Sequence, residues 1–273
     1  QSWDPSISAD GRYVVFYSYA SNLVTNDNNG VTDIFRKDLV SGAIVRVSTD
    51  ASGAEANAFS QQAAISADGR YVTFYSGASN LVAGDTNGTT DIFRKDLQTG
   101  AVVMVSTDAL GAPGNASNWE PSISADGRYV TFRSNASNLV AGDTNGVPDI
   151  FRKDLQSGAI VRVSTDASGG QGNGGSFETA VSADGRYVTF RSDASNLVAG
   201  DTNGMPDIFR KDLQTGAIVR ISTDASGAQG NNSSEGVSIS ADGRHIAFRS
   251  TASNLVIRDT NQYADIFVAD LDN

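Results

Sequence analysis

The sequence of 273 residues contains no cysteine, a single histidine and no long hydrophobic run. The absence of cysteine excludes disulfide bonds, thiolate zinc sites and cysteine nucleophiles. No stretch approaches about 18 consecutive apolar residues, so we expect no transmembrane helix. The histidine, His245, occupies a strand position that tyrosine fills at Tyr13, Tyr71, Tyr129 and Tyr187, and we interpret it as a packing substitution. Without a histidine partner, the many serines lack the base that activates a nucleophile.

Basic residues are also scarce, because 20 Lys and Arg stand against 31 Asp and Glu, for a net charge of −11 and an isoelectric point near 4.4. A surface of that sign repels phosphate backbones, and we therefore expect no nucleic-acid partner. The same charge favours a divalent cation as a partner, although solubility alone also accounts for it.

The phrase ISADGRYV, or a near variant, returns five times along the chain. Its aspartate recurs every 58 residues, at Asp10, Asp68, Asp126, Asp184 and Asp242. A fixed period of this length indicates a repeat architecture. We place the repeats at approximately 3–60, 61–118, 119–176, 177–234 and 235–273, within a single domain of residues 1–273. A residue present five times is more typical of a scaffold than of a unique active site.

Each repeat contains four short runs rich in β-branched and aromatic residues, which in the third repeat are 121–125, 128–134, 149–155 and 159–165. Such runs, bounded by Gly, Asp, Asn and Ser, predict strands rather than helices. Four strands per repeat predict an all-β fold, a five-bladed propeller of four-stranded antiparallel blades, in preference to a solenoid. The fifth repeat ends with DIFVADL at 265–271, so the last blade is expected to lack its outer strand. That open edge is a place where another chain could pair.

Three short motifs recur in every repeat. In the third repeat they are Ser124-Ala125-Asp126-Gly127, the strand Val130–Phe132, and Ile150-Phe151 followed by Asp154. Together they resemble the TolB-like propellers, also called PD40 or WD40-like β-propeller repeats. The resemblance covers the whole chain and implies a propeller that acts mostly as a binding platform, although some propellers belong to peptidases or glycosidases. Alanine replaces the proline of the family's turn, and the long loop is longer than in the common form.

The long loop between the second and third strands carries the pattern D-x-N-G-x-x-D. The residues of the five loops are Asp27, Asn29 and Asp33; Asp85, Asn87 and Asp91; Asp143, Asn145 and Asp149; Asp201, Asn203 and Asp207; and Asp259, Asn261 and Asp265. Calcium prefers six to eight oxygen ligands of these kinds, so the pattern predicts one Ca²⁺ per loop. The alternative is that Asp, Asn and Gly form turns without metal. The fifth loop departs from the pattern, because Gln262 replaces the glycine.

Residues just before each first strand are expected to border the central channel, on the face where loop sequences vary. They are Trp3 and Asp4; Gln61 and Gln62; Trp119 and Glu120; Phe177 and Glu178; and Glu235 and Gly236. An aromatic ring beside a carboxylate suits a sugar, and the alternative is that the rings plug the loops. The RKD motif of the third strand, Arg36-Lys37-Asp38 in the first repeat, is interpreted as a solvated strand face with ion pairs between blades.

These features predict a non-catalytic, calcium-binding propeller that serves as a binding or scaffold module for a protein or glycan. Loops of this kind bind calcium weakly and fill only where it is abundant, which indicates an extracytoplasmic bacterial protein. One alternative is a carbohydrate-active enzyme that uses channel-mouth carboxylates such as Asp4, Glu120 and Glu178. The similarity of the repeats argues against an enzyme. Another alternative is a recently amplified or engineered scaffold with no evolved ligand.

Overall fold

A computed structural model describes residues 1–261 and 263–271, which form 19 strands in five antiparallel sheets. The first sheet contains β1 (Ser2–Ile7), β2 (Tyr13–Ser18), β3 (Asp33–Asp38) and β4 (Ile44–Arg46). The second contains β5 (Ser60–Ile65), β6 (Tyr71–Ser76), β7 (Asp91–Asp96) and β8 (Val102–Met104). The third contains β9 (Asn118–Ile123), β10 (Tyr129–Ser134), β11 (Asp149–Asp154) and β12 (Ile160–Arg162). The fourth contains β13 (Ser176–Val181), β14 (Tyr187–Ser192), β15 (Asp207–Asp212) and β16 (Ile218–Arg220). The fifth contains β17 (Ser234–Ile239), β18 (His245–Ser250) and β19 (Asp265–Asp270).

The predicted fold class is confirmed: each repeat forms one up-and-down sheet, and the last sheet has three strands. Two boundaries differ from the sequence prediction. The first strand of each sheet begins earlier than expected, at Asn118 in the third repeat, and the outer strand is only three residues long. None of the described residues forms a helix long and apolar enough to cross a membrane.

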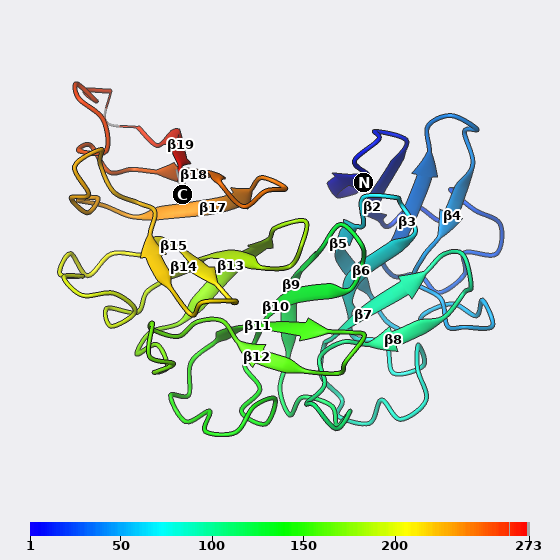
Figure 1. Ribbon diagram of the computed structural model, residues 1–273. Coiled ribbons are helices and arrows are strands. Elements are labelled where there is room, and N and C mark those ends of the chain that lie inside the picture. The colour runs from blue at the N-terminus through cyan, green and yellow to red at the C-terminus, as the bar shows by residue number, and fades with distance from the viewer. Residues whose placement is uncertain (262, 272–273) are drawn as a thin grey trace.

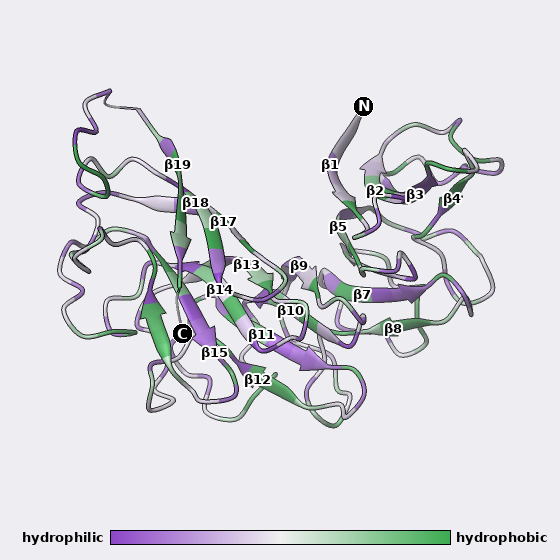
Figure 2. Ribbon diagram, turned by 45° about the horizontal axis from the view of Figure 1, so that its top comes forward, coloured by the Kyte–Doolittle hydropathy of each residue, from purple (hydrophilic) through white to green (hydrophobic). Residues whose placement is uncertain are grey.

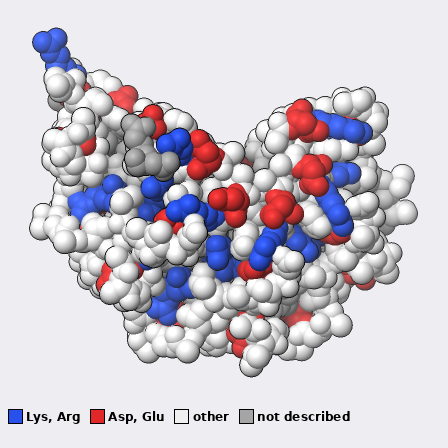
Figure 3. All heavy atoms as spheres, in the orientation of Figure 1, with Lys and Arg blue, Asp and Glu red and all other residues white. Residues whose placement is uncertain are grey.

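The five sheets are arranged as an arc, and each packs its face on the next (Figure 1). Contacts between neighbouring sheets run through consecutive innermost strands, from β1 to β5, β9, β13 and β17. The first sheet and the fifth stand apart at the two ends of the arc, and the space-filling view shows the surface hollowed between them (Figure 3). Within the described residues the disc is therefore open on one side.

Apolar side chains alternate with polar ones along the strands, so that each sheet presents hydrophobic residues to its neighbours (Figure 2). Between the second and third sheets, Ile92 and Val105 pack with Val130 and Phe132, and all four are fully buried. Phe132 also lies against Phe151, with ring centroids 6.0 Å apart. Each such side chain contributes about 1.5–3 kcal/mol through its removal from water.

In the second, third and fourth sheets an arginine and a lysine of the third strand tie the sheet to its neighbours. Arg152 lies over the ring of Tyr129 at 4.6 Å and donates a hydrogen bond of 2.7 Å to the carbonyl of Gly185 in the following sheet. Gly185 has φ +75°, and a Cβ there would lie 2.1 Å from the Tyr129 ring. Lys153 is 4% exposed and donates to the Thr107 carbonyl of the preceding sheet. The interpretation of RKD as a solvated face is therefore wrong for this lysine, which is buried because main-chain carbonyls satisfy its ammonium group.

Candidate functional site

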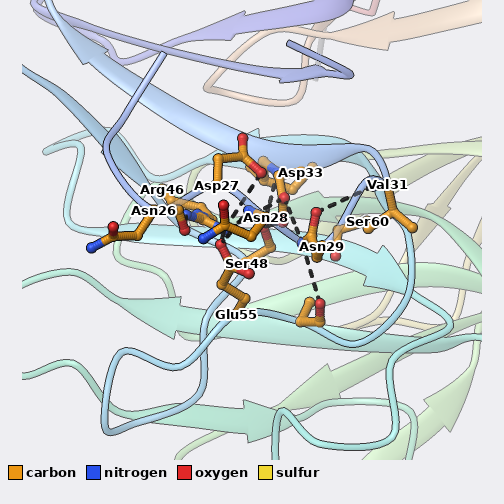
Figure 4. Close-up of polar contacts among 12 residues, drawn as sticks. Asn26, Asp27, Asn28, Asn29, Val31, Asp33, Arg46, Ser48, Glu55 and Ser60 are labelled. Atoms are coloured by element: carbon orange, nitrogen blue, oxygen red, sulfur yellow. Dashed lines mark hydrogen bonds and ion pairs between the residues drawn. The ribbon is translucent and has the colours of Figure 1, made fainter. Parts of the chain in front are cut away.

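The acidic loop of the first sheet folds around an arginine that the loop pattern does not contain (Figure 4). Arg46 comes from the end of β4, and its Nη1 atom lies 3.8 Å from Asp27 Oδ1 and 3.8 Å from Asp33 Oδ2. Arg46 also forms an ion pair with Glu55. The sequence analysis missed this cation because it lies 13 residues beyond Asp33, on another strand.

Asp33 is fully buried, and both of its carboxylate oxygens have donors inside the protein. Ser48 donates to Oδ1 at 2.5 Å, and the side-chain amide of Asn29 donates to Oδ2 at 2.8 Å. Burial raises the pKa of Asp33, while these hydrogen bonds and Arg46 oppose the rise. The Asn29 oxygen accepts a hydrogen bond from the Val31 main chain at 3.2 Å. The loop is thus ordered by its own polar contacts.

The same arrangement recurs in the third and fourth sheets. Arg162 lies 3.4 Å from Asp143 and 3.6 Å from Asp149. Arg220 lies 3.8 Å from Asp201 and 3.6 Å from Asp207. In both loops an asparagine, Asn145 or Asn203, donates its side-chain amide to a main-chain carbonyl of the following loop.

The second loop lacks the arginine, because Met104 occupies the equivalent strand position. Asp91 is fully buried and accepts hydrogen bonds from Ser106 and Asn87. Burial raises the pKa of Asp91 to about 6, and the nearby negative charge of Asp85 adds to the rise. Burial also raises the pKa of Asp85. Among the described residues, this loop therefore holds two carboxylates with no cation beside them to compensate their charge.

These arrangements bear on the predicted calcium sites. In the first, third and fourth loops the guanidinium group already lies beside both carboxylates, and the asparagine oxygen accepts a main-chain hydrogen bond. Among the described residues no group of three or more His, Cys, Asp or Glu side chains converges as a metal cluster. In the fifth loop Asn261 donates to Asp265 at 2.9 Å, and Gln262 lies outside the described residues. The second loop, with Asp85, Asn87 and Asp91, differs from these three in having no arginine beside its carboxylates among the described residues, although its Asn87 oxygen also accepts a main-chain hydrogen bond, from Thr89 at 3.2 Å.

A second candidate site lies at the mouth of the central channel, where the innermost strands converge. A cavity of about 330 Å³ is lined there by side chains from all five sheets. The residues at its rim are Asp4, Gln62, Glu120, Glu178 and Gly236. All five have positive φ, between 45° and 66°, and each follows the position where the strand register shifts. Positive φ in the four non-glycine residues is strained backbone, which concentrates at functional sites.

The rim carboxylates connect successive sheets. Glu120 accepts a hydrogen bond of 2.7 Å from the main-chain N–H of Glu178, and Glu178 accepts one of 2.5 Å from Gly236. Arg133 forms an ion pair with Glu120 at 3.0 Å. These contacts fix the carboxylates in the channel rather than leaving them free in solvent.

The residues that precede the rim positions lie opposite the second strand of their own sheet. Arg133 is sandwiched between Trp119 and Phe177, at 4.5 and 5.2 Å from their ring centroids. Trp3 stacks on Tyr17 with centroids 5.2 Å apart and remains 39% exposed. Glu235 forms an ion pair with a fifth-sheet arginine, Arg249.

The structure thus brings Asp4, Glu120 and Glu178 to one cavity and places Trp119 and Phe177 against Arg133. The second-strand partners were missed by the sequence analysis. They are Tyr17, Tyr75, Arg133, Arg191 and Arg249. A signal was present, because this position is Tyr in the first two repeats and Arg in the last three, whereas most of the strand around it is constant.

The geometry defines a β-propeller, and comparison with solved structures identifies the fold as TolB-like. TolB from Acinetobacter baumannii superposes with a TM-score of 0.57 at 17% identity, over 98% of this chain and 54% of that one. A putative TolB from Agrobacterium tumefaciens gives 0.59 at 18% identity, over 99% and 77%. The β-propeller domain of the trilobed protease from Pyrococcus furiosus, which has an open velcro topology, gives 0.58 at 12% identity, over 98% and 68%.

The predicted resemblance to TolB-like propellers is therefore confirmed at the level of fold. The chain spans about half the length of the Acinetobacter protein. An oligogalacturonate lyase in complex with manganese shares the fold, with a TM-score of 0.57 at 14% identity, over 97% of this chain and 61% of that one. The sequence matches no protein-family model and no curated protein.

Proposed function

We propose that the chain is a non-catalytic binding module in an extracytoplasmic bacterial protein, and that its protein or glycan ligand docks at the channel mouth. One observation carries the proposal. The buried framework is nearly the same in every sheet, whereas the rim residues of one cavity vary among the sheets, as Asp4, Gln62, Glu120, Glu178 and Gly236. Variation at these rim positions, four of which are non-glycine residues with positive φ, is typical of a surface adapted to a ligand.

The chemistry of the rim suits a polar ligand with apolar faces. The Glu120 and Glu178 carboxylates line the cavity and present fixed acceptor oxygens, and Trp3, which precedes Asp4 outside the lining, offers a partly exposed ring. Arg133, held by Glu120 and two aromatic rings, offers donors in a fixed orientation. A small number of fixed polar groups in a concave site is what orients a ligand.

A non-catalytic role is supported by the hydrogen bonds that the rim carboxylates accept from the main chain of neighbouring sheets. Glu120 and Glu178 each accept a main-chain hydrogen bond from the next sheet, so they join the blades of the scaffold. The histidine, His245, lies on β18 with its Nδ1 atom 3.4 Å from Asp270. A glycosidase needs one carboxyl to donate a proton and another to act as nucleophile or base, and both must be free to do so.

The proposal includes one calcium ion, bound by a single loop. We assign it to Asp85, Asn87 and Asp91 of the second loop, whose carboxylates lack an arginine. Bound there, the ion would neutralise the charges of the buried Asp91 and the half-buried Asp85 and hold the loop against the sheet, away from the channel.

The channel proposal is tested by probing the chain on a glycan array and against a displayed peptide library, with calcium present. We expect captured ligands to be lost by Trp3→Ala combined with Asp4→Asn, and by Glu120→Gln. Val40→Ala is the matched control, because Val40 is 78% exposed on a turn outside the rim. Ligands that bind all variants equally would contradict the proposal, as would turnover of a bound sugar that Glu178→Gln abolishes.

A further inference from the structure

Buried lysines of β7, β11 and β15 hold their ammonium groups against pairs of main-chain carbonyls in the preceding sheet. Each pair comes from a threonine and the aspartate that follows it. Lys95 donates to Thr49 and Asp50 at 3.1 and 2.7 Å, Lys153 to Thr107 and Asp108 at 3.0 and 2.6 Å, and Lys211 to Thr165 and Asp166 at 3.0 and 2.7 Å. These lysines are at most 5% exposed. Because a buried ammonium group is costly unless acceptors surround it, the carbonyl pair is a binding site for that group.

The fourth and fifth sheets meet at the same carbonyl pair without a lysine. Ala269 of β19 takes the lysine position, because the motif there is Val268-Ala269-Asp270 in place of Arg-Lys-Asp. The pair comes from Thr223 and Asp224, which precede Ala269 by the same 46 and 45 residues that separate each lysine from its own pair. Within the described residues the Thr223 carbonyl accepts no hydrogen bond, and that of Asp224 accepts one, of 2.9 Å, from Gly227. Thr223 is also half-buried, whereas the three equivalent threonines are buried.

We propose that the Thr223 and Asp224 carbonyls bind the primary alkylammonium group of a ligand. The part of a lysine side chain that alanine lacks is three methylene carbons and the ammonium group. A cavity of about 430 Å³ lies at this position and is lined by Thr223, Asp224 and Ala269. n-Propylammonium therefore has the length that reaches from Ala269 to the carbonyl pair.

The rest of the cavity wall suits the alkyl part of such a ligand. Ile221, Phe248 and Leu255 line the same cavity, and all three are buried residues of the core between the two sheets. Removal of a propyl group from water adds affinity that an inorganic cation does not gain. Calcium takes six to eight oxygen ligands, more than the carbonyl pair and the Thr223 hydroxyl supply.

A carboxylate beside the carbonyl pair favours a cation there. Asp224 is the counterpart of Asp108, whose carboxylate opposes the fall that burial causes in the pKa of Lys153. Hydrogen bonds from Ser226 and Ala228 lower the pKa of Asp224. The Asp224 carboxylate therefore stays ionised at neutral pH and attracts an ammonium group.

The site belongs to the third strand and not to the outer one. In the second, third and fourth sheets an outer strand is present, and the donor to the carbonyl pair is still the third-strand lysine. In the described part of the chain no residue of β8, β12 or β16 donates to these carbonyls. An outer strand placed on β19 as β12 is placed on β11 would therefore leave Thr223 and Asp224 without a donor. The ammonium group comes from a free alkylamine or from a lysine side chain of another polypeptide.

The test uses the full chain at pH 7 with n-propylammonium chloride as the probe. We expect the melting temperature to rise by about 2–3 °C at ten times the dissociation constant. The amide resonances of Asp224 and Ala225, whose nitrogens are bonded to the two carbonyls, should shift with the same saturation curve. N-acetyl-lysine methylamide is the second probe. Binding of both probes assigns the group to a lysine side chain, and binding of n-propylammonium alone assigns it to a free amine.

Variants separate this site from general effects of the amine. Ala269→Lys supplies the ammonium group from within the chain, so we expect a higher melting temperature and no response to n-propylammonium. Val40→Lys, which adds the same charge to an exposed turn of the first sheet, should keep the wild-type response. Lys153→Ala opens the equivalent position between the second and third sheets, and n-propylammonium should restore part of the stability that it loses.

Several results would overturn the proposal. An unmodified chain that neither gains stability nor shows amide shifts with n-propylammonium would do so. An equal response to potassium chloride or n-propanol would show that the alkylammonium group is not what is recognised. Amide shifts confined to the channel mouth, or an undiminished response in Ala269→Lys, would place the amine elsewhere.

Discussion

Arg162 lies 3.6 Å from the buried carboxylate of Asp149 and compensates its charge. The second sheet has the same buried carboxylate, Asp91, but places Met104 where the arginine would be. Two loops of nearly the same sequence therefore differ in whether a buried negative charge has a cation. Because an uncompensated charge in the interior is costly, this difference makes the second loop the most sensitive point of the scaffold.

The stability of the chain should depend on pH through Asp91. Its carboxyl keeps its proton up to about pH 6 in the folded chain, whereas an aspartate in the unfolded chain loses it near 3.9. Between these values the folded state binds more protons, so the free energy of unfolding falls as pH rises from about 4 to about 6. The difference between the two pKa values corresponds to about 3 kcal/mol. Denaturant unfolding of the wild type and Asp91→Asn across this range measures it.

In Asp91→Asn this part of the pH dependence should disappear. The free energy of unfolding of the variant should therefore rise relative to that of the wild type as the pH rises. Asp149→Asn is the matched control, because Arg162 opposes the rise that burial causes in the pKa of Asp149, so its pH effect should be smaller, and the substitution leaves Arg162 with Asp143. A parallel response of the two variants would contradict the assignment.

Met104→Arg should stabilise the chain at neutral pH. The new guanidinium would compensate Asp85 and Asp91 as Arg162 compensates Asp143 and Asp149, with an expected gain of about 1–2 kcal/mol. The gain should vanish near pH 4, where Asp91 is protonated. Urea unfolding at pH 7 and pH 4 measures both values, and the reverse substitution Arg162→Met should lose stability at pH 7. A gain that is the same at both pH values would point to packing instead.

Calcium should stabilise the chain through the second loop. A cation that binds only the folded state raises the melting temperature, and one bound between Asp85 and Asp91 removes the cost of their charges. We expect added calcium to raise the melting temperature of the wild type and of Asp149→Asn, but not of Asp91→Asn or Met104→Arg. An unchanged wild type would reject the calcium prediction altogether. Loss of the effect in Asp149→Asn would place calcium in the arginine-containing loops as well.

Removal of a buried lysine should weaken the contact between two sheets. Lys153 donates to the Thr107 and Asp108 carbonyls of the preceding sheet at 3.0 and 2.6 Å, so Lys153→Met leaves both without that donor. The expected loss is about 2–3 kcal/mol, measured by urea unfolding. Within the described part of the chain, the side chain of the equivalent Lys37 of the first sheet bonds Gly42 of its own sheet and no other residue, so Lys37→Met should cost less than about 1 kcal/mol. Equal losses would show that the effect comes from the strand itself.

Features that depend on local pattern could be predicted from the sequence, and features that depend on pairing across sheets could not. The Asp126-Gly127 turn and the flanking β-branched runs are sufficient to predict where the strands lie and how many there are. The contact between Arg46 and Asp33 joins a loop to a strand and has no fixed spacing motif. The buried state of Lys153 depends on carbonyls that the preceding repeat supplies, so charge alone indicated solvent exposure. The positive φ of Glu120 arises from a bulge, which residue type does not signal.

That bulge leads to a prediction about strain at the channel mouth. Gln62 has φ 47°, a left-handed conformation that costs a side-chain-bearing residue about 1–2 kcal/mol. Gly236 occupies the equivalent position in the fifth sheet with φ 66°. Gln62→Gly should therefore stabilise the chain by about 0.5–1 kcal/mol, since relief of strain exceeds the added entropy of the unfolded chain. Gln61→Gly, at the neighbouring position without positive φ, should destabilise it. Thermal unfolding of the two variants gives the comparison, and destabilisation by both would mean that the bulge is not strained.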